Sequence, residues 1–562
     1  MKYRKLFFIE LPKVVMMPNE FLFRKIFRLF CALLNQNEKQ FQMFRKILVS
    51  LLLVLPFQFL FAQSGMQNWF LLNPATDGFN GVACNAAYDQ LLKGKTGTDV
   101  IVAVIDGGVD VSHPDLSANI WTNKNEIPDN GIDDDHNGYI DDIHGWDFIG
   151  GKDGTDVNQD NYELTRLYRE LKKKYEFGNT TGDKTEYDYF LKLQTEYNAK
   201  KADAQSNLDF YTGFTESIEQ VIHDIGKSPL TYEDLQNYQT TDNKLLLAKI
   251  YMMAIGKSNG TDDYATVLDE FKEGKDQYYS MVNYGYNLDF DPRNIVGDDY
   301  SDATQKGYGN NEVKGPDGMH GTHVSGIIGA VRDNGIGMDG VAKHVKIMAV
   351  RCVPDGDERD KDVANAIRYA VDNGAKVINM SFGKGYAYNK ADVDDAVKYA
   401  MSKDVLLVHG AGNDAESNDN TDNFPNDHYA DGGYAAGWIE VGASQPDGTA
   451  ASFSNYGKVN VDLFSPGTEI YSTIPDGKYK YLQGTSMASP VCAGVAALIR
   501  SYFPSLTNAQ VKEVLLNSVY KPAGKTPIPG QKKKKASMKK LCVSGGIVNA
   551  YNAVLLAESM TK

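Results

Sequence analysis

The sequence predicts an α/β fold in which a mainly parallel sheet carries helices on both faces. Short runs rich in Val and Ile occur at 100–106, 345–350, 376–383, 405–413 and 438–444. These runs are almost continuously apolar, which is typical of parallel strands that are buried on both sides. Helical patterns at 360–373 and 391–403 lie between them. This alternation of buried strands with helices indicates a doubly wound sheet.

A long segment without strand patterns interrupts this fold. Residues 155–300 are rich in Tyr, Lys, Glu, Asp and Leu, and their apolar residues have helical spacing. Within them, Thr231 followed by Glu233 and Asp234, after the break at Pro229, resembles a helix start. We therefore expect a mainly helical insertion at 155–300, which divides the α/β domain into residues 63–154 and 301–562.

The N-terminal residues have the pattern of an export signal. In residues 43–62, two basic residues precede an apolar run that ends at a small residue, Ala62. A membrane anchor is the alternative, but the apolar run is short for a bilayer span and contains Pro56. We interpret residues 1–42 as a non-native extension ahead of a true start at Met43. The mature protein is then expected to be exported, periplasmic or extracellular, with no stable membrane anchor after signal cleavage.

Composition restricts the class of partner. Of the 562 residues, 42% are hydrophobic, which is enough for a packed core. The net charge of −15 argues against nucleic acid as a partner, and we expect a soluble monomer. Four of the five cysteines follow the signal, so one or two disulfides are possible in an exported protein. Cys492 lies in an apolar stretch and is expected to be a small buried hydrophobe.

Three polar residues stand where an open α/β sheet can place a site. Asp106 ends the first apolar run and precedes two glycines, at the carboxyl end of its strand. His320, in GMHGTHVSGIIGA, begins a helix that is expected to be buried, and Ser486, in GTSMASP, begins another. Each has an alternative reading when taken singly. Asp106 could belong to a turn, Ser486 could be a helix cap, and His320 could form a zinc pair with His323.

Together the three motifs, in the chain order Asp, His, Ser, closely resemble the subtilisin-like serine proteases, or subtilases. The resemblance covers about 85–150 and 300–558. It departs from compact members of the family in the long separation between Asp106 and His320, for which the insertion accounts. The resemblance implies a serine endopeptidase that needs no catalytic cofactor. Ser486 would attack the peptide carbonyl, His320 would act as base and then acid, and Asp106 would orient the imidazole.

The same resemblance implies a donor for the oxyanion of the reaction. Asn413 ends the stretch LLVHGAGN and looks like the family's oxyanion-hole residue. The backbone N–H of Ser486, at the start of its helix, would be the second donor. The alternative is an ordinary Asn in a Gly-rich turn.

A polypeptide substrate would lie along MSFGKG, which resembles the family's substrate-pairing strand. Such strand addition uses main-chain hydrogen bonds and gives affinity without strong sequence preference. A plain buried strand is the alternative. The residues expected to form this site and an apolar-leaning S1 pocket are Ser381, Phe382, Gly383, Gly410 and Gly412.

An acidic segment after the first strand places oxygen ligands at alternating positions. Its start matches an EF-hand loop, but the twelfth position holds His144 instead of Glu, so a full EF-hand is not expected. The segment also resembles the calcium loops of subtilases, and a solvated acidic turn is the alternative. We expect a structural Ca²⁺ at Asp133, Asp135, Asn137 and either Asp141 or Asp142.

The C-terminal residues combine a basic tract with an apolar one. The lysine-rich residues 532–540 are expected to form a loop that faces solvent or an anion. The following GGIVNAYNAV resembles the closing helix of the family domain. Two other functions remain open. The fold could serve binding without catalysis, although every catalytic position is filled, or the insertion could limit access and make the protein a processing protease.

Overall fold

The computed structural model describes residues 67–175 and 183–562, which form two compact units. One unit comprises residues 158–294 with 354–357, and the other holds the remaining described residues. The predictions for residues 1–42 and 43–62 lie outside the described part of the chain. Within that part, no helix is long and apolar enough to cross a bilayer.

The larger unit is built on a seven-stranded parallel sheet in the order β2-β3-β1-β4-β5-β6-β7. The sheet confirms the predicted doubly wound α/β class. The strand order reverses at β1, which has β3 on one side and β4 on the other, and open α/β sheets place their sites at the carboxyl ends of such strands. The strands are β1 (Val100–Asp106), β2 (Gly145–Asp147), β3 (Val345–Arg351), β4 (Val377–Met380), β5 (Leu406–Gly410), β6 (Trp438–Ser444) and β7 (Leu463–Pro466).

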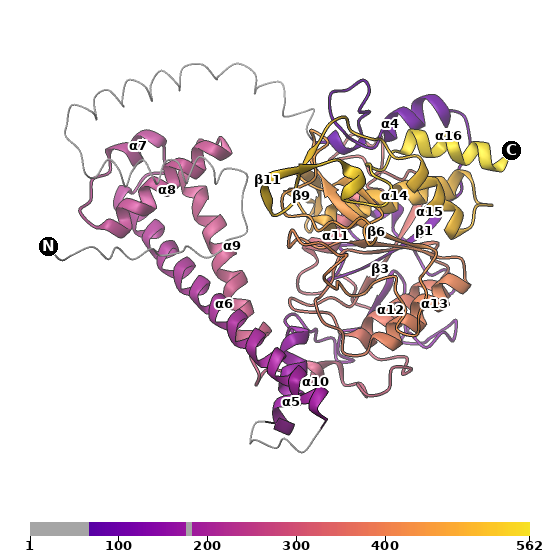
Figure 1. Ribbon diagram of the computed structural model, residues 1–562, viewed down its shortest axis with the longest axis horizontal. Coiled ribbons are helices and arrows are strands. Elements are labelled where there is room, and N and C mark those ends of the chain that lie inside the picture. Colours follow the sequence, from indigo (N-terminus) through magenta and orange to yellow (C-terminus); the bar gives the residue numbers. More distant parts are fainter. Residues whose placement is uncertain (1–66, 176–182) are drawn as a thin grey trace. The chain divides into compact units, whose positions relative to one another are not determined.

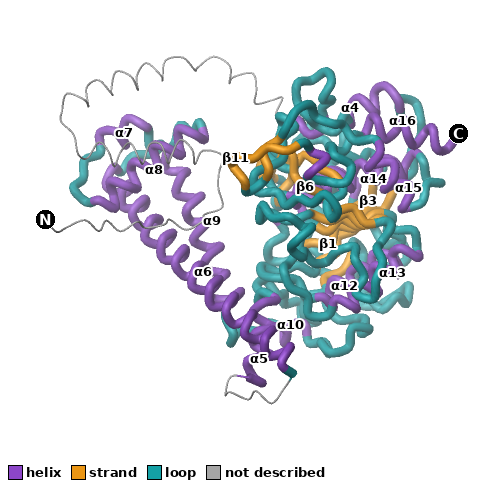
Figure 2. Tube along the Cα trace, in the orientation of Figure 1, coloured by secondary structure: helices purple, strands orange, loops and turns teal. Residues whose placement is uncertain are grey.

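Helices cover both faces of this sheet, as Figures 1 and 2 show. On one face lie α11 (Met319–Gly329) and α14 (Thr485–Tyr502), and on the other lie α12 (Asp360–Asp372) and α13 (Lys390–Ser402). Within β1, Val102 and Val104 belong to the first core, while Ala103 and Ile105 belong to the second. Because successive side chains of a strand point to opposite faces, both sets must be apolar. This explains the continuous apolar run in the sequence.

Further elements complete the larger unit. Near the ends of the chain lie α4 (Cys84–Ala86), α15 (Asn508–Asn517) and α16 (Ala550–Thr561), the last at the place of the expected closing helix. The antiparallel hairpin of β8 (Ile470–Ile474) and β9 (Lys478–Leu482) was not predicted. The predicted loop at 532–540 is wrong in its first half, because β11 (Gln531–Ala536) pairs with β10 (Thr526–Ile528). Exposed lysine ammonium groups stay in water on such a short edge strand, so a basic tract can form one.

The smaller unit is helical. Its helices are α5 (Glu163–Tyr175), α6 (Lys184–Ile225), α7 (Tyr232–Asn237), α8 (Asn243–Asn259) and α9 (Val267–Ser280). The chain passes from this unit into the larger one within α10 (Arg293–Val296). Ile218, Val221 and Phe271 contribute to an apolar core that α6 and α9 share. Thr231 and Asp234 form a capping box at the start of α7, which confirms the helix start expected there.

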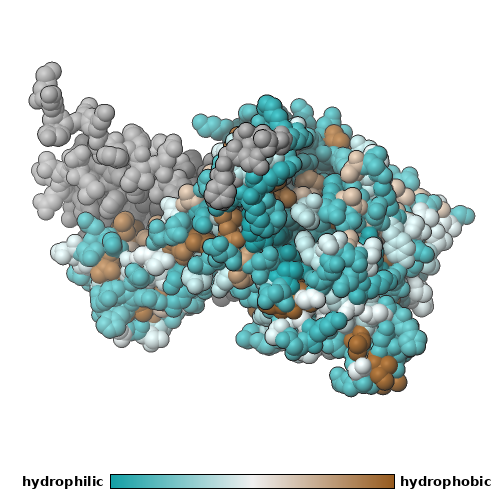
Figure 3. Space-filling view, turned by 90° about the horizontal axis from the view of Figure 1, so that it is seen from below, coloured by the Kyte–Doolittle hydropathy of each residue, from teal (hydrophilic) through white to brown (hydrophobic). Residues whose placement is uncertain are grey.

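Cysteines do not cross-link the described part of the chain. Cys84, Cys352, Cys492 and Cys542 are all buried, and none forms a disulfide, so the bridges considered possible are absent there. Cys492 is 0% exposed, as expected of a small buried hydrophobe, and burial raises the pKa of its thiol. On the face drawn in Figure 3, hydrophilic residues predominate and hydrophobic ones form small separate groups, in keeping with the acidic composition.

Candidate active site

Asp106 and His320 form the first contact of the site. Asp106 is the last residue of β1 and is buried, whereas His320 lies in the first turn of α11 with its side chain 39% exposed. The Nδ1 atom of His320 lies 2.8 Å from Oδ1 of Asp106. Burial lowers the pKa of His320, but the carboxylate of Asp106 more than offsets this, so the pKa is raised. The contact favours the tautomer that has its hydrogen on Nδ1, which leaves Nε2 as a proton acceptor.

Small residues allow α11 to approach β1 closely. A Cβ atom on Gly321 would lie 2.3 Å from the carbonyl oxygen of Gly108, so a larger residue would push the helix away. The backbone N–H of Gly107 donates to Oδ1 of Asp106 at 2.8 Å and fixes the carboxylate. The glycines on both sides of the pair therefore determine its geometry.

Ser486 lies in the first turn of α14, where backbone N–H groups have no partner within the helix. Its hydroxyl donates to the carbonyl oxygen of Ser381 at 3.1 Å, and the hydroxyl of Ser381 donates to the carbonyl oxygen of Ser486 at 3.0 Å. These reciprocal bonds join the carboxyl end of β4 to the start of α14. Within the described residues, the hydroxyl of Ser486 makes no hydrogen bond to His320, a contact that is often unformed in free enzymes.

Asn413 lies beyond the carboxyl end of β5 and is exposed. Its Oδ1 accepts from the backbone N–H of Thr485 at 2.9 Å and from the Thr485 hydroxyl at 3.2 Å. These bonds occupy the amide oxygen, while no described residue accepts from the Nδ2 group. Asn413 thus offers an oriented N–H donor next to the residue that precedes Ser486.

Thr485 is a site residue that sequence reasoning missed. In addition to its contacts with Asn413, its hydroxyl oxygen accepts from the backbone N–H of Gly412 at 3.1 Å. Gly412 has a φ of +103°, and a Cβ atom there would lie 2.5 Å from Nδ2 of Asn455, so only glycine fits. The only sequence signal for Thr485 is its position beside Ser486.

The predicted substrate residues lie at the carboxyl ends of β4 and β5. Ser381 is buried against α14, Phe382 is half-buried and Gly383 is exposed. A Cβ atom on Gly383 would lie 2.6 Å from Oδ1 of Asn423, and one on Gly410 would lie 3.3 Å from the backbone of the residue before Ser486. The structure therefore brings this segment and the Asn413 loop together around α14.

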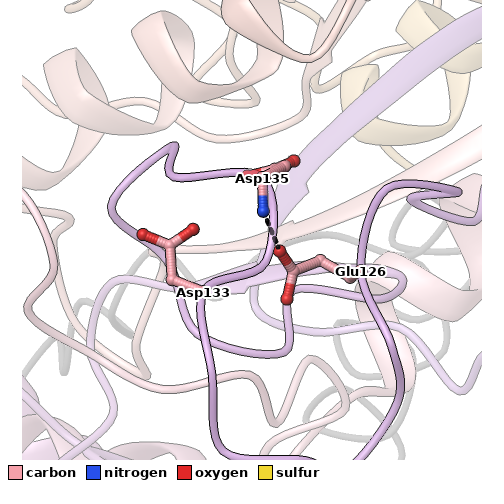
Figure 4. A group of neighbouring side chains, drawn as sticks. All are labelled: Glu126, Asp133 and Asp135. Atoms are coloured by element: carbon pink, nitrogen blue, oxygen red, sulfur yellow. Dashed lines mark hydrogen bonds between the residues drawn. The ribbon is translucent and has the colours of Figure 1, made fainter.

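In and next to the acidic segment, three carboxylates form the one group of three or more His, Cys, Asp or Glu side chains, among the described residues, whose ligand atoms lie close enough to share a cation. Oxygens of Glu126, Asp133 and Asp135 all lie within 4.8 Å of one another (Figure 4). The backbone N–H of Asp135 donates to Oε1 of Glu126 at 3.1 Å. A set of three carboxylates is chemically suited to a hard cation such as Ca²⁺. Glu126 lies outside the motif recognised in the sequence.

The other predicted metal ligands have different partners. The carboxylate of Asp141 accepts from the backbone N–H groups of Asn130 and Gly131 at 3.1 and 2.9 Å. Nδ2 of Asn137 donates to Asp142 at 3.1 Å, and its Oδ1 accepts from a backbone N–H. The carboxylate of Asp141 is therefore not one of the group of three, although its backbone N–H donates to Glu126 at 3.1 Å. Asn137 contacts the group through its backbone N–H, which donates to Asp133 and Asp135 at 3.0 Å each.

Asp142 is buried behind this segment. Tyr369, Asn123 and Asn137 donate to its carboxylate at 2.6, 2.8 and 3.1 Å. Burial raises the pKa of Asp142 to about 6 even though these three bonds lower it. The residue therefore anchors the acidic segment to α12, which carries Tyr369.

The alternative zinc pair is not supported. Nε2 of His323 lies 3.0 Å from the carbonyl oxygen of Lys480, and the ring is 0% exposed. Burial lowers the pKa of His323 to about 4. Across residues 67–175 and 183–562, the group of three that could hold a metal contains no histidine.

The fold and the site define a class: parallel α/β proteins with an Asp–His pair and a serine at the carboxyl edge of the sheet. The chain belongs to the subtilase family, because residues 97–545 match the model of that family, "Peptidase_S8: Subtilase family". The family expected from the three motifs is thereby confirmed.

Curated relatives are proteases. The chain is 35% identical over 273 residues to "Thermophilic serine proteinase" of Bacillus sp. (strain AK1), an alignment that spans 48% of this chain and 62% of that protein. It is 38% identical over 206 residues to thermitase of Thermoactinomyces vulgaris, spanning 36% and 68%. It is 30% identical over 374 residues to "Cell wall-associated protease" of Bacillus subtilis (strain 168), spanning 64% and 39%. The chain thus spans less than two thirds of the first and third of these relatives.

Proposed function

We propose that the protein is a serine endopeptidase that hydrolyses polypeptides through an acyl-enzyme intermediate. The observation that carries the proposal is the 2.8 Å contact between Nδ1 of His320 and the buried carboxylate of Asp106. This contact leaves Nε2 as the basic atom that a serine nucleophile requires. Family membership supports the same reaction class.

Ser486 would be the nucleophile. Its hydroxyl now donates to the carbonyl oxygen of Ser381, so the side chain would have to turn to direct its hydrogen toward His320. His320 would take that proton as Ser486 attacks the peptide carbonyl, and would return it to the leaving amine. The Asn413 Nδ2 group and the backbone N–H of Ser486 would stabilise the oxyanion, since both are held in place before the reaction begins.

The substrate would be an extended polypeptide that pairs with residues 381–383. Main-chain hydrogen bonds of this kind favour broad specificity. The half-buried ring of Phe382 and the glycines at 410 and 412 support an apolar-leaning S1 pocket. We further propose that the protein is exported by the segment 43–62, and that it acts as a monomer outside the cytoplasm.

A structural calcium ion would stabilise the acidic segment. Glu126, Asp133 and Asp135 would hold it, because three carboxylates crowded within 4.8 Å repel one another without a cation. The ion would take no part in the reaction.

Cleavage-site profiling tests the proposal. Wild-type protein and the Ser486→Ala variant are incubated with a peptide library, with and without a chelator. We expect cleavage with an apolar P1 preference by wild type and none by the variant. Cleavage by Ser486→Ala at the wild-type rate would show that Ser486 is not the nucleophile.

A further inference from the structure

The proposed mechanism does not use a buried histidine that lies against residues 381–383, the proposed substrate-binding segment. His409 is in β5, is 0% exposed, and pairs in register with Glu440 of β6. Its Nδ1 atom lies 2.9 Å from Oε2 and 3.1 Å from Oε1 of Glu440. The indole N–H of Trp438 donates to the same carboxylate at 3.0 Å. The imidazole is therefore held in a fixed orientation.

The other ring nitrogen of His409 contacts the segment itself. Nε2 lies 2.6 Å from the carbonyl oxygen of Phe382. A carbonyl oxygen can only accept, so Nε2 carries a hydrogen whether the shared proton at Nδ1 rests on the ring or on Glu440. Without His409, this part-buried carbonyl would lose its hydrogen-bond donor among the described residues, which costs free energy.

Successive carbonyl groups of the segment are held by different elements. The carbonyl of Ser381 accepts the hydroxyl hydrogen of Ser486 from α14, and the carbonyl of Phe382 accepts from His409 of β5. In the free protein the two bonds fix the peptide planes that precede the exposed Gly383, and the bond from His409 remains when the Ser486 hydroxyl turns toward His320. Precise placement of these planes determines whether an extended substrate can pair with the segment, because ordering a loose strand on binding costs free energy.

We propose that His409, oriented by Glu440, is a positioning residue that sets the substrate-binding segment 381–383 for extended peptides. The proposal rests on the proposed peptidase function. It assigns His409 no contact with the reacting atoms. Loss of the His409 side chain should therefore weaken the contribution of substrate residues beyond P1 to kcat/KM. It should leave the reactivity of Ser486 unchanged.

Two substitutions distinguish the roles of the two ring nitrogens of His409. His409→Gln places an amide N–H near the position of Nε2, so it keeps the bond to Phe382. His409→Asn places its amide near Nδ1, so it keeps only a contact to Glu440. The readout is the ratio of kcat/KM for a tetrapeptide amide to kcat/KM for an N-acetyl amino-acid ester with the same P1 residue.

We expect His409→Asn to lower this ratio roughly tenfold or more, and His409→Gln to keep it near the wild-type value. Labelling of Ser486 by a small fluorophosphonate should proceed at similar rates in both variants. Leu407→Ala, a buried truncation on the same strand, controls for loss of stability and should leave the ratio unchanged. An unchanged ratio in His409→Asn, or an equal fall in both His409 variants, would overturn the proposal.

A fourth variant keeps the test decisive if His409→Asn does not fold. Glu440→Gln weakens the hold on the ring and should lower the ratio several-fold, so an unchanged ratio in this variant would also overturn the proposal. Failure of the proposed function gives a different result. In that case the wild-type protein itself would neither cleave the tetrapeptide nor react with the fluorophosphonate.

Discussion

Nδ1 of His320 lies 2.8 Å from the carboxylate of Asp106, and this carboxylate raises the pKa of the imidazole against the effect of burial. The active form of a general base is the neutral one, so activity should rise with pH through the pKa of His320. The position of that rise therefore reports the strength of the contact.

Replacing Asp106 by Asn removes the negative charge but keeps the size of the side chain. We expect kcat to fall by about 10⁴-fold, since the imidazole loses its tautomer preference. The acid limb of residual activity should move to lower pH, because the pKa of His320 falls when the charge is removed. The measurement is the pH profile of kcat/KM. Asp99→Asn, which affects an exposed carboxylate 3.9 Å from His344, is the control and should not move the limb.

Asn413 should act on turnover and not on binding. Asn413→Ala removes the Nδ2 donor, and loss of one oxyanion donor costs roughly 10²–10³ in kcat, a magnitude taken from subtilisin of this same family. KM should change little, because the oxyanion forms only after attack. Steady-state kinetics on a peptide substrate make the test, with Asn413→Asp as the near-isosteric variant that should be impaired at least as much. A purely KM-based defect would argue against an oxyanion role.

Calcium should stabilise the protein without altering its chemistry. An ion that binds only the folded state at 100 times its Kd adds about 2.7 kcal/mol, so Tm should rise with calcium and fall with a chelator. The Asp135→Asn variant should lose most of this response. Asp447→Asn, an exposed carboxylate that accepts from Thr449, should keep it. A calcium-independent Tm in the wild type would rule out the site.

The buried bond from Tyr369 to Asp142 should depend on pH in a defined direction. The folded-state pKa of Asp142 is raised to about 6, because burial favours the protonated carboxyl group. The stability that this preference contributes is complete below about pH 4 and is lost as the pH rises through 6. The Tyr369 hydroxyl stabilises the ionised form, so Tyr369→Phe should cost about 1–3 kcal/mol above pH 6 and less near pH 4.

Urea denaturation at pH 4 and pH 8 checks this difference. Tyr399→Phe is the matched control, because Tyr399 donates to Asp372 at 2.6 Å on the exposed surface. We expect its free energy of unfolding to change little at either pH. A cost for Tyr369→Phe that is larger at pH 4 than at pH 8 would contradict the assigned direction.

Much of the fold could be predicted because the central strands are buried on both faces. The runs 100–106 and 438–444 coincide with β1 and β6 for this reason. The strands β2 and β7 have only 3 and 4 residues, too few for a pattern to stand out from a loop. The runs through 383 and 413 overshoot β4 and β5, because the apolar and Gly-rich residues that follow those strands lie in loops that carry candidate site residues.

The site could be predicted where a motif encodes local geometry. Asp106 and His320 meet because the small residues around them allow β1 and α11 to touch. Glu126 and the orientation of the Ser486 hydroxyl could not be predicted. Glu126 approaches Asp135 only after the loop between them closes, and the Ser486 rotamer depends on a carbonyl from a distant strand.

The most direct test of the account is active-site labelling with a fluorophosphonate, followed by mass spectrometry of the modified peptide. We predict that wild-type protein is modified at Ser486 alone, that Ser486→Ala is not modified, and that His320→Ala reacts far more slowly at the same site. Modification of another residue in place of Ser486, or labelling of Ser486 that is equally fast without His320, would contradict the assignment of the Asp106–His320–Ser486 triad.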